Sequence, residues 1–379
     1  MKILIAIDSF KGSLTSIEAG NACAAGIRRV YPEAEIVVRP LADGGEGTTQ
    51  ALVSGLKGTY RTVTVSDPLG RPISAQYGIL PDKTAVIEMA AASGLPLLTE
   101  SERNPLHTTT LGFGELIRDA ITQGCRSFIL GIGGSATNDG GIGCLQALGF
   151  DFLDLSRKNV SPTAAGLSQI ETISADHILP ELQECTFHVA CDVKNPLCGE
   201  QGCSAIFAPQ KGADAAMIGQ MDASLARFAA MTKTVYPDAD GKAPGAGAAG
   251  GLGFGLMAYL HASLEPGTEL ILRETGIADA VRDADLVITG EGCLDAQTAM
   301  GKAPAGIARL AKSYGKPVIA FSGAVREGAE ACHDAGIDAY FPILRRVETL
   351  EDALNPQNAA VNLTDTAEQV FRLIRTFHL

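Results

Sequence analysis

The segment LGIGGSATNDGG, residues 130–141, follows the apolar run SFIL and precedes IGCLQAL. It places glycines, hydroxyls, an amide and a carboxylate at a predicted strand-to-helix junction. The first turn of a helix has unpaired N–H groups, and glycine lets an anion approach the backbone closely. The segment therefore predicts a phosphate site, with candidate nucleotide contacts at Gly133, Gly134, Ser135, Thr137 and Asn138.

A second glycine-rich segment, PGAGAAGGLGFG at residues 244–255, adds Gly245 and Gly247 as candidate phosphate contacts. The first segment has an alternative interpretation. Its GIGGSA string matches a dinucleotide-binding fingerprint, and Asp151 lies about twenty residues further on, as that fingerprint requires. A nicotinamide-dependent dehydrogenase of a small hydroxy acid therefore stays open at this point, although the polar TND residues suit phosphate or metal contacts better.

Charged residues follow two predicted strands near the N-terminus. Lys11 lies three residues after Asp8 in DSFKGSLTS, and Asp43 and Glu46 flank two glycines in PLADGGEGT. A lysine there can neutralise a phosphate or carboxylate, and carboxylates can hold a metal ion. We interpret Lys11 as catalytic and the two acids as magnesium ligands, with a capped helix and an acidic turn as the structural alternatives.

The segment ITGEGCLDAQTAMGKAP, residues 288–304, places acids and a lysine beside glycines. Glu291 completes the predicted magnesium set, and Lys302 is expected to neutralise nucleotide charge. Either Asp295 or Asp192, the latter in ACDVKNPL, could receive the proton of a substrate hydroxyl. A helix capped by DAQT and a turn capped by Asp192 are the structural alternatives.

Together these groups favour phosphoryl transfer, which needs phosphate cradles, a metal ion, an aligned hydroxyl and a proton acceptor. The G-x-x-x-x-G-K-[ST] pattern does not occur, which excludes a Walker-type kinase. A phosphometabolite sensor that binds without turnover is a nonenzymatic alternative.

Continuous apolar runs alternate with segments of helical periodicity, which indicates an α/β fold with parallel sheets. The strand candidates are ILIAI, AEIVVRPL, AVIEMA, SFILGIG, FHVACDV, DLVITG, PVIAFSG and DAYFPIL. Closely spaced, alternating strands before residue 80 predict hairpins of a second sheet. We expect two α/β domains, one formed by residues 1–60 and 282–379 and the other by residues 61–281.

A chain of 379 residues favours two domains over one, and no apolar run approaches the ~18 residues of a membrane span. The formal charge of −13 opposes binding to nucleic acid or an anionic membrane. The N-terminal apolar segment is too short for a secretory signal, so we expect a cytoplasmic protein. Its nine cysteines lack a C-x-x-C pair and are expected to be buried free thiols. Whether copies of the chain associate is left open.

The motifs occur in an order that resembles the bacterial glycerate kinase type 1 family: DSFKGSLTS, PLADGGEGT, EMAAASGL, LGIGGSATNDGG, ACDVKNPL, PQKGA, PGAGAAGG and VITGEGCLDAQTAMGKAP. The resemblance implies phosphorylation of D-glycerate by ATP with Mg²⁺, at the 2-hydroxyl. It also implies an inserted flavodoxin-like domain and an active site in a cleft between two domains. Similar proteins usually carry arginine after GEG, where this chain has Cys293, so Lys302 or Arg273 would have to supply that contact.

Overall fold

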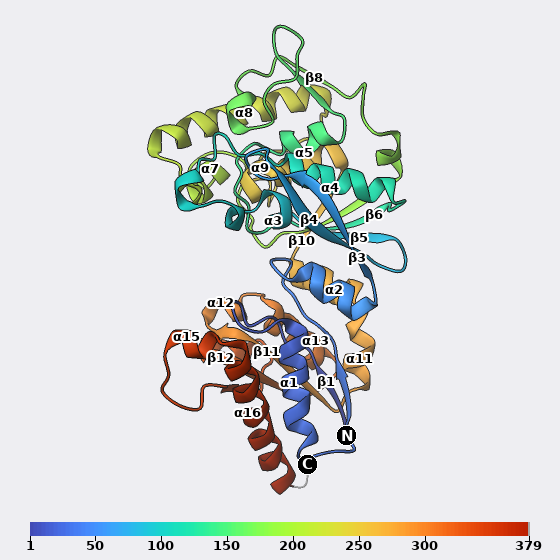
Figure 1. Ribbon diagram of the computed structural model, residues 1–379, viewed down its shortest axis with the longest axis vertical. Coiled ribbons are helices and arrows are strands. Elements are labelled where there is room, and N and C mark those ends of the chain that lie inside the picture. The colour runs from blue at the N-terminus through green and yellow to red at the C-terminus, as the bar shows by residue number, and fades with distance from the viewer. Residues whose placement is uncertain (378–379) are drawn as a thin grey trace. The chain divides into compact units, whose positions relative to one another are not determined.

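The computed structural model describes residues 1–377 and divides into two compact units (Figure 1). The first unit comprises Met1–Asp43, Gln50–Leu56 and Thr268–Leu379, and the second comprises Gly44–Thr49 and Lys57–Gly267. Each unit has its own sheet and its own hydrophobic core. The α/β fold class predicted from the sequence is confirmed.

The first unit contains a five-stranded parallel sheet in the order β13-β12-β11-β1-β2. Its elements are β1 (Lys2–Ile5), α1 (Ser16–Arg28), β2 (Glu35–Val38), most of α2 (Thr48–Leu56), α10 (Gly267–Glu274), α11 (Ile277–Asp283), β11 (Leu286–Leu294), α12 (Ala296–Ala299), α13 (Ala303–Ser313), β12 (Val318–Val325), α14 (Ala331–Asp334), β13 (Ala339–Pro342), α15 (Leu350–Leu354) and α16 (Pro356–Thr376).

Helices cover both faces of this sheet, because alternate residues of its strands point to opposite sides. Ile3 and Ile5 of β1 pack with residues of α1 and α16, which lie side by side in Figure 1. Leu4 and Ala6 belong to the opposite core, with residues of α11 and α13. A parallel strand buried on both faces reads as a continuous apolar run, which is why the sequence predicted β1 correctly.

The second unit contains a six-stranded mixed sheet in the order β10-β9-β6-β5-β4-β3 and a two-stranded sheet, β7-β8. Its elements are β3 (Thr59–Ser66), β4 (Pro72–Ile79), β5 (Thr84–Glu88), α3 (Ala90–Ser93), η1 (Leu95–Leu97), η2 (Glu100–Glu102), α4 (Leu111–Thr122), β6 (Ser127–Gly131), α5 (Ile142–Ala147), β7 (Asp151–Leu153), α6 (Ala164–Leu167), β8 (Thr172–Ser174), η3 (Pro180–Glu184), β9 (Thr186–Ala190), α7 (Cys203–Phe207), η4 (Pro209–Lys211), α8 (Ala215–Val235), α9 (Ala248–Leu260) and β10 (Ser263–Glu265).

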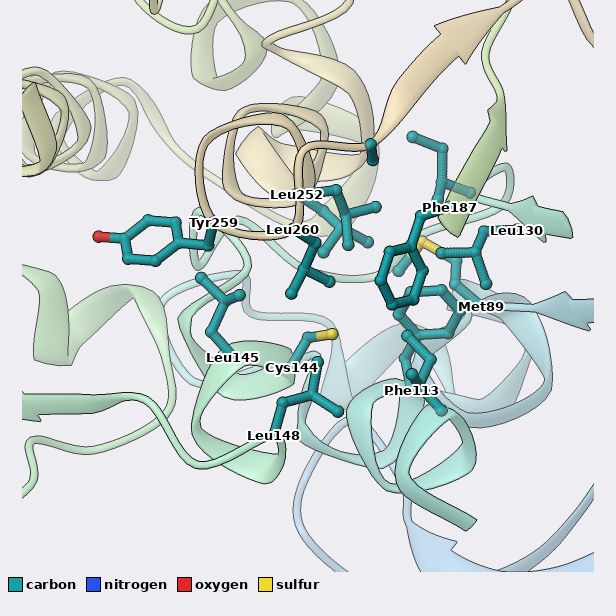
Figure 2. Close-up of a cluster of buried hydrophobic side chains, with 14 of the residues drawn as sticks. Met89, Phe113, Leu130, Cys144, Leu145, Leu148, Phe187, Leu252, Tyr259 and Leu260 are labelled. Carbon is teal, nitrogen blue, oxygen red and sulfur yellow. The ribbon is translucent and has the colours of Figure 1, made fainter. Parts of the chain in front are cut away.

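The core of the second unit gathers side chains from its strands and from α4, α5 and α9 (Figure 2). Leu130 and Phe187 come from neighbouring strands, and Phe113, Leu145 and Leu252 come from the three helices. β3 and β4 form the predicted antiparallel hairpin at one edge. The remaining strands, β5, β6, β9 and β10, run parallel, so their carboxyl ends lie along one edge of the sheet.

The structure corrects the expected placement of the flavodoxin-like order. Numbered along their own chain, the strands of the first unit follow the order 2-1-3-4-5, which is the flavodoxin-like order. The second unit has an antiparallel hairpin and does not follow it. The division at Gly267 also differs from the expected boundary at residues 281/282, because Ile277 and Val281 pack in the core of the first unit.

Candidate active site

Asp8 lies at the point in the first sheet where the strand order reverses. Strand β1 has β2 on one side and β11 on the other, and Asp8 N–H donates to Gly290 O of β11 at 2.9 Å. In open α/β sheets, ligands bind outside the carboxyl ends of the strands at such a reversal. Asp8 and Glu291, which follows Gly290, therefore occupy the position where this fold forms a site.

The Asp8 carboxyl is buried, with 4% of its surface exposed, and accepts a hydrogen bond from Ser9 N–H at 2.7 Å. Burial raises the pKa of Asp8 to about 7, and the negative charges of Asp43 and Glu291 add to this effect. The Ser9 hydrogen bond and the Lys11 charge act in the opposite direction. Asp8, Asp43 and Glu291 are called the acidic cluster below. Its Asp8 carboxyl can bind or release a proton near neutral pH.

Lys11 forms an ion pair with Asp43 of this cluster. Its ammonium lies 3.8 Å from Asp43 Oδ2, and 62% of its side chain is exposed. An exposed ion pair of this length contributes little to stability. This ion pair therefore does little to fix the Lys11 side chain in place.

Glu291 and Asp295 are connected through α12. Thr298 Oγ1 donates to Glu291 Oε1 at 2.5 Å, and Asp295 Oδ1 accepts from the backbone N–H groups of Gln297 and Thr298. Burial raises the pKa of Glu291, while the Thr298 hydrogen bond and the Lys302 charge lower it. Lys302 lies 3.7 Å from Asp295. The structure thus brings Glu291, Asp295 and Lys302 together, with Asp295 serving as the N-cap of α12.

In the second unit, polar groups line the carboxyl edge of the parallel strands. The register aligns Glu88, Gly131, Ala190 and Glu265 in one row across β5, β6, β9 and β10. The predicted phosphate segment follows Gly131 directly, and Asp192 follows Ala190. Residues 132–141 are called the glycine loop below. The sheet therefore places the glycine loop and Asp192 at the same edge.

The glycine loop has an exposed part and a buried part. Gly133 and Gly134 are exposed, whereas Ser135, Thr137 and Asn138 are buried. The buried Lys211 ammonium donates to Ser135 Oγ at 2.6 Å and to Thr137 O at 2.7 Å. A ligand can therefore reach the loop at Gly133 and Gly134, and at the small exposed part of Ser135.

The other polar residues of the glycine loop, Asn138 and Asp139, form hydrogen bonds to neighbouring parts of the second unit. Asp139 accepts from Thr110 N–H and Thr110 Oγ1, both at 2.8 Å, and from Gly141 N–H at 3.0 Å. Asn138 Nδ2 donates to Ser204 Oγ at 2.9 Å. These contacts connect the loop to the starts of α4 and α7, where Thr110 and Ser204 lie.

The second glycine-rich segment packs against the protein itself. Gly245 and Gly247 are buried, and a Cβ at Gly247 would lie 2.3 Å from Pro196 O. Gly250 has a φ of +67°, its carbonyl accepts from Gly140 N–H at 3.0 Å, and a Cβ there would lie 2.0 Å from Thr137 O. These glycines allow two backbone segments to touch, which a side chain would prevent.

Asp192 and Glu46 have more exposed surroundings. Asp192 is exposed, and its Oδ1 accepts from Gly267 N–H at 3.0 Å. Glu46 is exposed in the segment 44–49. Glu88, at the end of β5, accepts from Thr49 N–H at 2.6 Å and from Gly47 N–H at 3.3 Å, and thereby fixes that segment.

Across residues 1–377, no group of three or more His, Cys, Asp or Glu side chains is spaced to hold a metal ion.

Comparison with known proteins decides the family. The model of the Glycerate kinase family matches residues 3–375. A Haemophilus influenzae protein named glycerate kinase is 49% identical over 375 residues, covering 99% of both chains. The Escherichia coli glycerate 2-kinase is 45% identical over 354 residues, covering 93% of each. The chain belongs to the glycerate kinase family.

A solved structure supports the same assignment. A Salmonella typhimurium protein, provisionally named glycerate kinase 2, superposes with a TM-score of 0.92 at 43% identity. The match covers 100% of this chain and 99% of the other. As a member of the glycerate kinase family, the chain is an enzyme that transfers a phosphoryl group from ATP to glycerate.

The dinucleotide interpretation of the glycine loop is not supported. A dinucleotide fingerprint opens a helix directly after its strand, but here β6 ends at Gly131 and α5 begins at Ile142. Asp151 accepts from Asn159 Nδ2 at 2.8 Å and contacts His177 Nδ1 at 2.6 Å. Family membership likewise favours a kinase over a dehydrogenase.

The structure brings three further residues to these sites that the sequence did not single out as site residues: Asp8, Glu88 and Lys211. The available signal was position, since Asp8 follows one apolar strand and Glu88 ends another. Cys293, which replaces the expected arginine, is partly buried in β11.

In the described part of the chain, no helix is long and apolar enough to cross a membrane.

Proposed function

We propose that this enzyme phosphorylates D-glycerate at its 2-hydroxyl, forming 2-phosphoglycerate and ADP. The observation that carries the proposal is that a member of the glycerate kinase family has an acidic cluster at the strand-order reversal of its first unit, and its second unit has a glycine loop at the carboxyl ends of its parallel strands. The 2-hydroxyl is chosen because a relative that is 45% identical is named glycerate 2-kinase.

The proton of the attacking hydroxyl needs an acceptor. We propose Asp8 for this role, because its buried carboxyl lies at the strand-order reversal and, without a bound metal ion, has a pKa of about 7, so that it can accept and release a proton. Asp192 is the second candidate, since it is exposed at the other edge described above. Asp295 is reassigned as a positioning residue, because its carboxylate caps α12.

Substrate anions need positive or N–H-rich surroundings. Gly133, Gly134 and Ser135 are proposed to contact phosphate oxygens, and Lys11 and Lys302 to neutralise substrate charge. Thr137, Asn138, Gly245 and Gly247 are proposed to support the glycine loop through packing, because they are buried.

Carboxylates of the acidic cluster are suitable donors for a magnesium ion by their chemistry, although the three are not spaced to hold one by themselves. The Asp43 and Glu291 charges raise the pKa of Asp8, the Asp43 charge also raises the pKa of Glu291, and a divalent cation would relieve that repulsion. Mg²⁺ is usually held by one or two carboxylates together with phosphate oxygens and water. We propose Asp43 and Glu291 as its protein ligands, with Glu46 as a further candidate; the ion would neutralise charge on the transferred phosphoryl group.

A cytoplasmic location is proposed from the thiols. All nine cysteines are free, and buried free thiols suit a reducing compartment.

An assay of ADP formation tests the proposed function. Purified protein with ATP and Mg²⁺ should form ADP when D-glycerate is added, and should not do so with glycerol, which lacks the carboxylate. NADH fluorescence should be unchanged by the protein. Quenching of NADH without any glycerate-dependent ADP would favour the dehydrogenase instead.

A further inference from the structure

Lys211 is a buried cation without a carboxylate partner. Only 2% of its surface is exposed, and its ammonium donates to Ser135 Oγ and Thr137 O. Among residues 1–377, no carboxylate lies within 4.0 Å of Lys211 Nζ. The charged or titratable groups that face it are the Cys203 thiol and Asp139, whose oxygens are already bonded to Thr110 and Gly141.

A buried charge is energetically unfavourable unless an opposite charge compensates it. Burial accordingly lowers the pKa of Lys211 to about 8, so the charge is retained at neutral pH at an energetic cost. An anion bound beside the glycine loop would offset that cost.

The hydrogen bond between Lys211 and Ser135 also orients the serine. Because Ser135 Oγ accepts a hydrogen bond from the Lys211 ammonium, its own O–H must point toward a different acceptor. The described part of the chain provides no acceptor for this O–H. Ser135 retains 9% exposure and follows the exposed Gly133 and Gly134, so a ligand can reach it.

We propose that Lys211 is a positioning residue that prepares Ser135 to donate a hydrogen bond to an anionic oxygen of a substrate, while its charge attracts that oxygen. The oxygen belongs either to a phosphate of ATP or to the carboxylate of glycerate. This inference rests on the proposed function, because it assigns a role within the same site.

Equilibrium binding of ATP and of D-glycerate, measured separately by calorimetry, tests the inference. Lys211→Met should weaken the binding of one of the two ligands by about tenfold or more, which is the effect of losing a charge-assisted hydrogen bond. The affinity for the other ligand should stay within twofold of the wild-type value. The weakened ligand identifies the source of the anionic oxygen. Lys233→Met, an exposed lysine of α8, is the charge-matched control and should change neither affinity.

Ser135→Ala should weaken the same ligand, and the double variant should be little worse than Lys211→Met, because both residues act through one O–H group. The wild-type affinity for that ligand should also fall as the pH rises from 7 to 9.5, as the Lys211 ammonium deprotonates. In Lys211→Arg this pH dependence should disappear, since a guanidinium stays charged.

Unchanged affinities in folded Lys211→Met, or an equal loss for both ligands, would overturn the inference. If Lys211→Met does not fold, Ser135→Ala decides by the same criteria. Wild-type turnover separates the two claims: an inactive wild-type enzyme refutes the proposed function, whereas an active one with unaffected Lys211→Met binding refutes only this inference.

Discussion

The protonation of Asp8 shows how the fold sets the chemistry of a single residue. Its carboxyl lies at the end of a buried strand, and its surroundings include two further acids. Neither the burial nor the two neighbouring charges is a property of Asp8 itself. The same side chain in an exposed turn would be ionised at neutral pH and would be a poor proton acceptor.

Asp8→Asn should raise stability and lower activity. The folded-state pKa of Asp8, about 7, exceeds its ordinary value of 3.8, so the stability contribution of the neutral form is present below pH 3.8 and is lost as the pH rises through 7. The free energy of unfolding of the variant, relative to that of the wild type, should therefore increase between pH 4 and 7, by at most about 4 kcal/mol. Urea unfolding at pH 4.5 and pH 8 measures this difference.

Turnover of Asp8→Asn should fall by roughly a hundredfold or more, the usual contribution of a general base. A stability advantage that does not grow between the two pH values would show that Asp8 is already ionised at low pH. Nearly normal turnover would remove Asp8 as the proton acceptor.

At the scale of elements, α12 connects Asp295 to Glu291 through Thr298. Asparagine caps helices about as well as aspartate, whereas alanine does not. Turnover of Asp295→Asn should therefore stay within about tenfold of the wild-type value. Asp295→Ala should lose more turnover than this, and its free energy of unfolding should fall by about 1 kcal/mol. Comparison of kcat and thermal unfolding for the two variants checks this. Equal losses in both would show that the Asp295 charge itself is required.

The contact between the glycine loop and the start of α9 predicts a large penalty at Gly250. Gly250→Ala would combine a positive φ with a Cβ 2.0 Å from Thr137 O, and should destabilise the protein by about 3 kcal/mol or more. The matched control is Gly219→Ala in the exposed part of α8, where a Cβ meets no atom within 4 Å. It should stabilise the helix by about 0.5–1 kcal/mol.

Chemical denaturation of the two glycine variants gives both values. If Gly250→Ala were as stable as Gly219→Ala, the close backbone contact would not form, and the supporting role proposed for this segment would fail.

Much of the element pattern could be predicted from the sequence. All eight strand candidates form strands, as expected of apolar runs between helical segments, and the hairpin formed where alternation and turn residues predicted it. The roles of glycines were harder to predict. Gly247 was predicted to contact phosphate, but it accommodates the backbone of Pro196, and Gly250 of the same segment accommodates the backbone of Thr137; both partners are distant along the chain.

The site was predicted only in part for the same reason. The sequence placed Glu291, Asp295 and Lys302 in one segment, and the structure brings them together around α12. Lys211 contacts Ser135 across 76 positions of sequence, and that separation gives no local signal. Effects that depend on burial and on distant charges require the fold.

At the scale of the whole molecule, each unit has its own core and its own set of polar groups at the carboxyl edge of a sheet. We expect both sets to take part in one reaction. Hydrogen exchange should therefore slow in peptides covering residues 8–13 and residues 132–136 when D-glycerate and a non-hydrolysable ATP analogue with Mg²⁺ are added together. Protection confined to one unit would contradict a shared reaction.

The central claim is that the γ-phosphoryl group of ATP is transferred to the 2-hydroxyl of D-glycerate. Phosphorus-31 NMR of a reaction containing the protein, ATP, Mg²⁺ and D-glycerate tests it most directly, because the 2- and 3-phosphate esters are distinct species. The account predicts 2-phosphoglycerate in equal amount to the ADP formed. A spectrum with only 3-phosphoglycerate, or with ADP and inorganic phosphate alone, would contradict it.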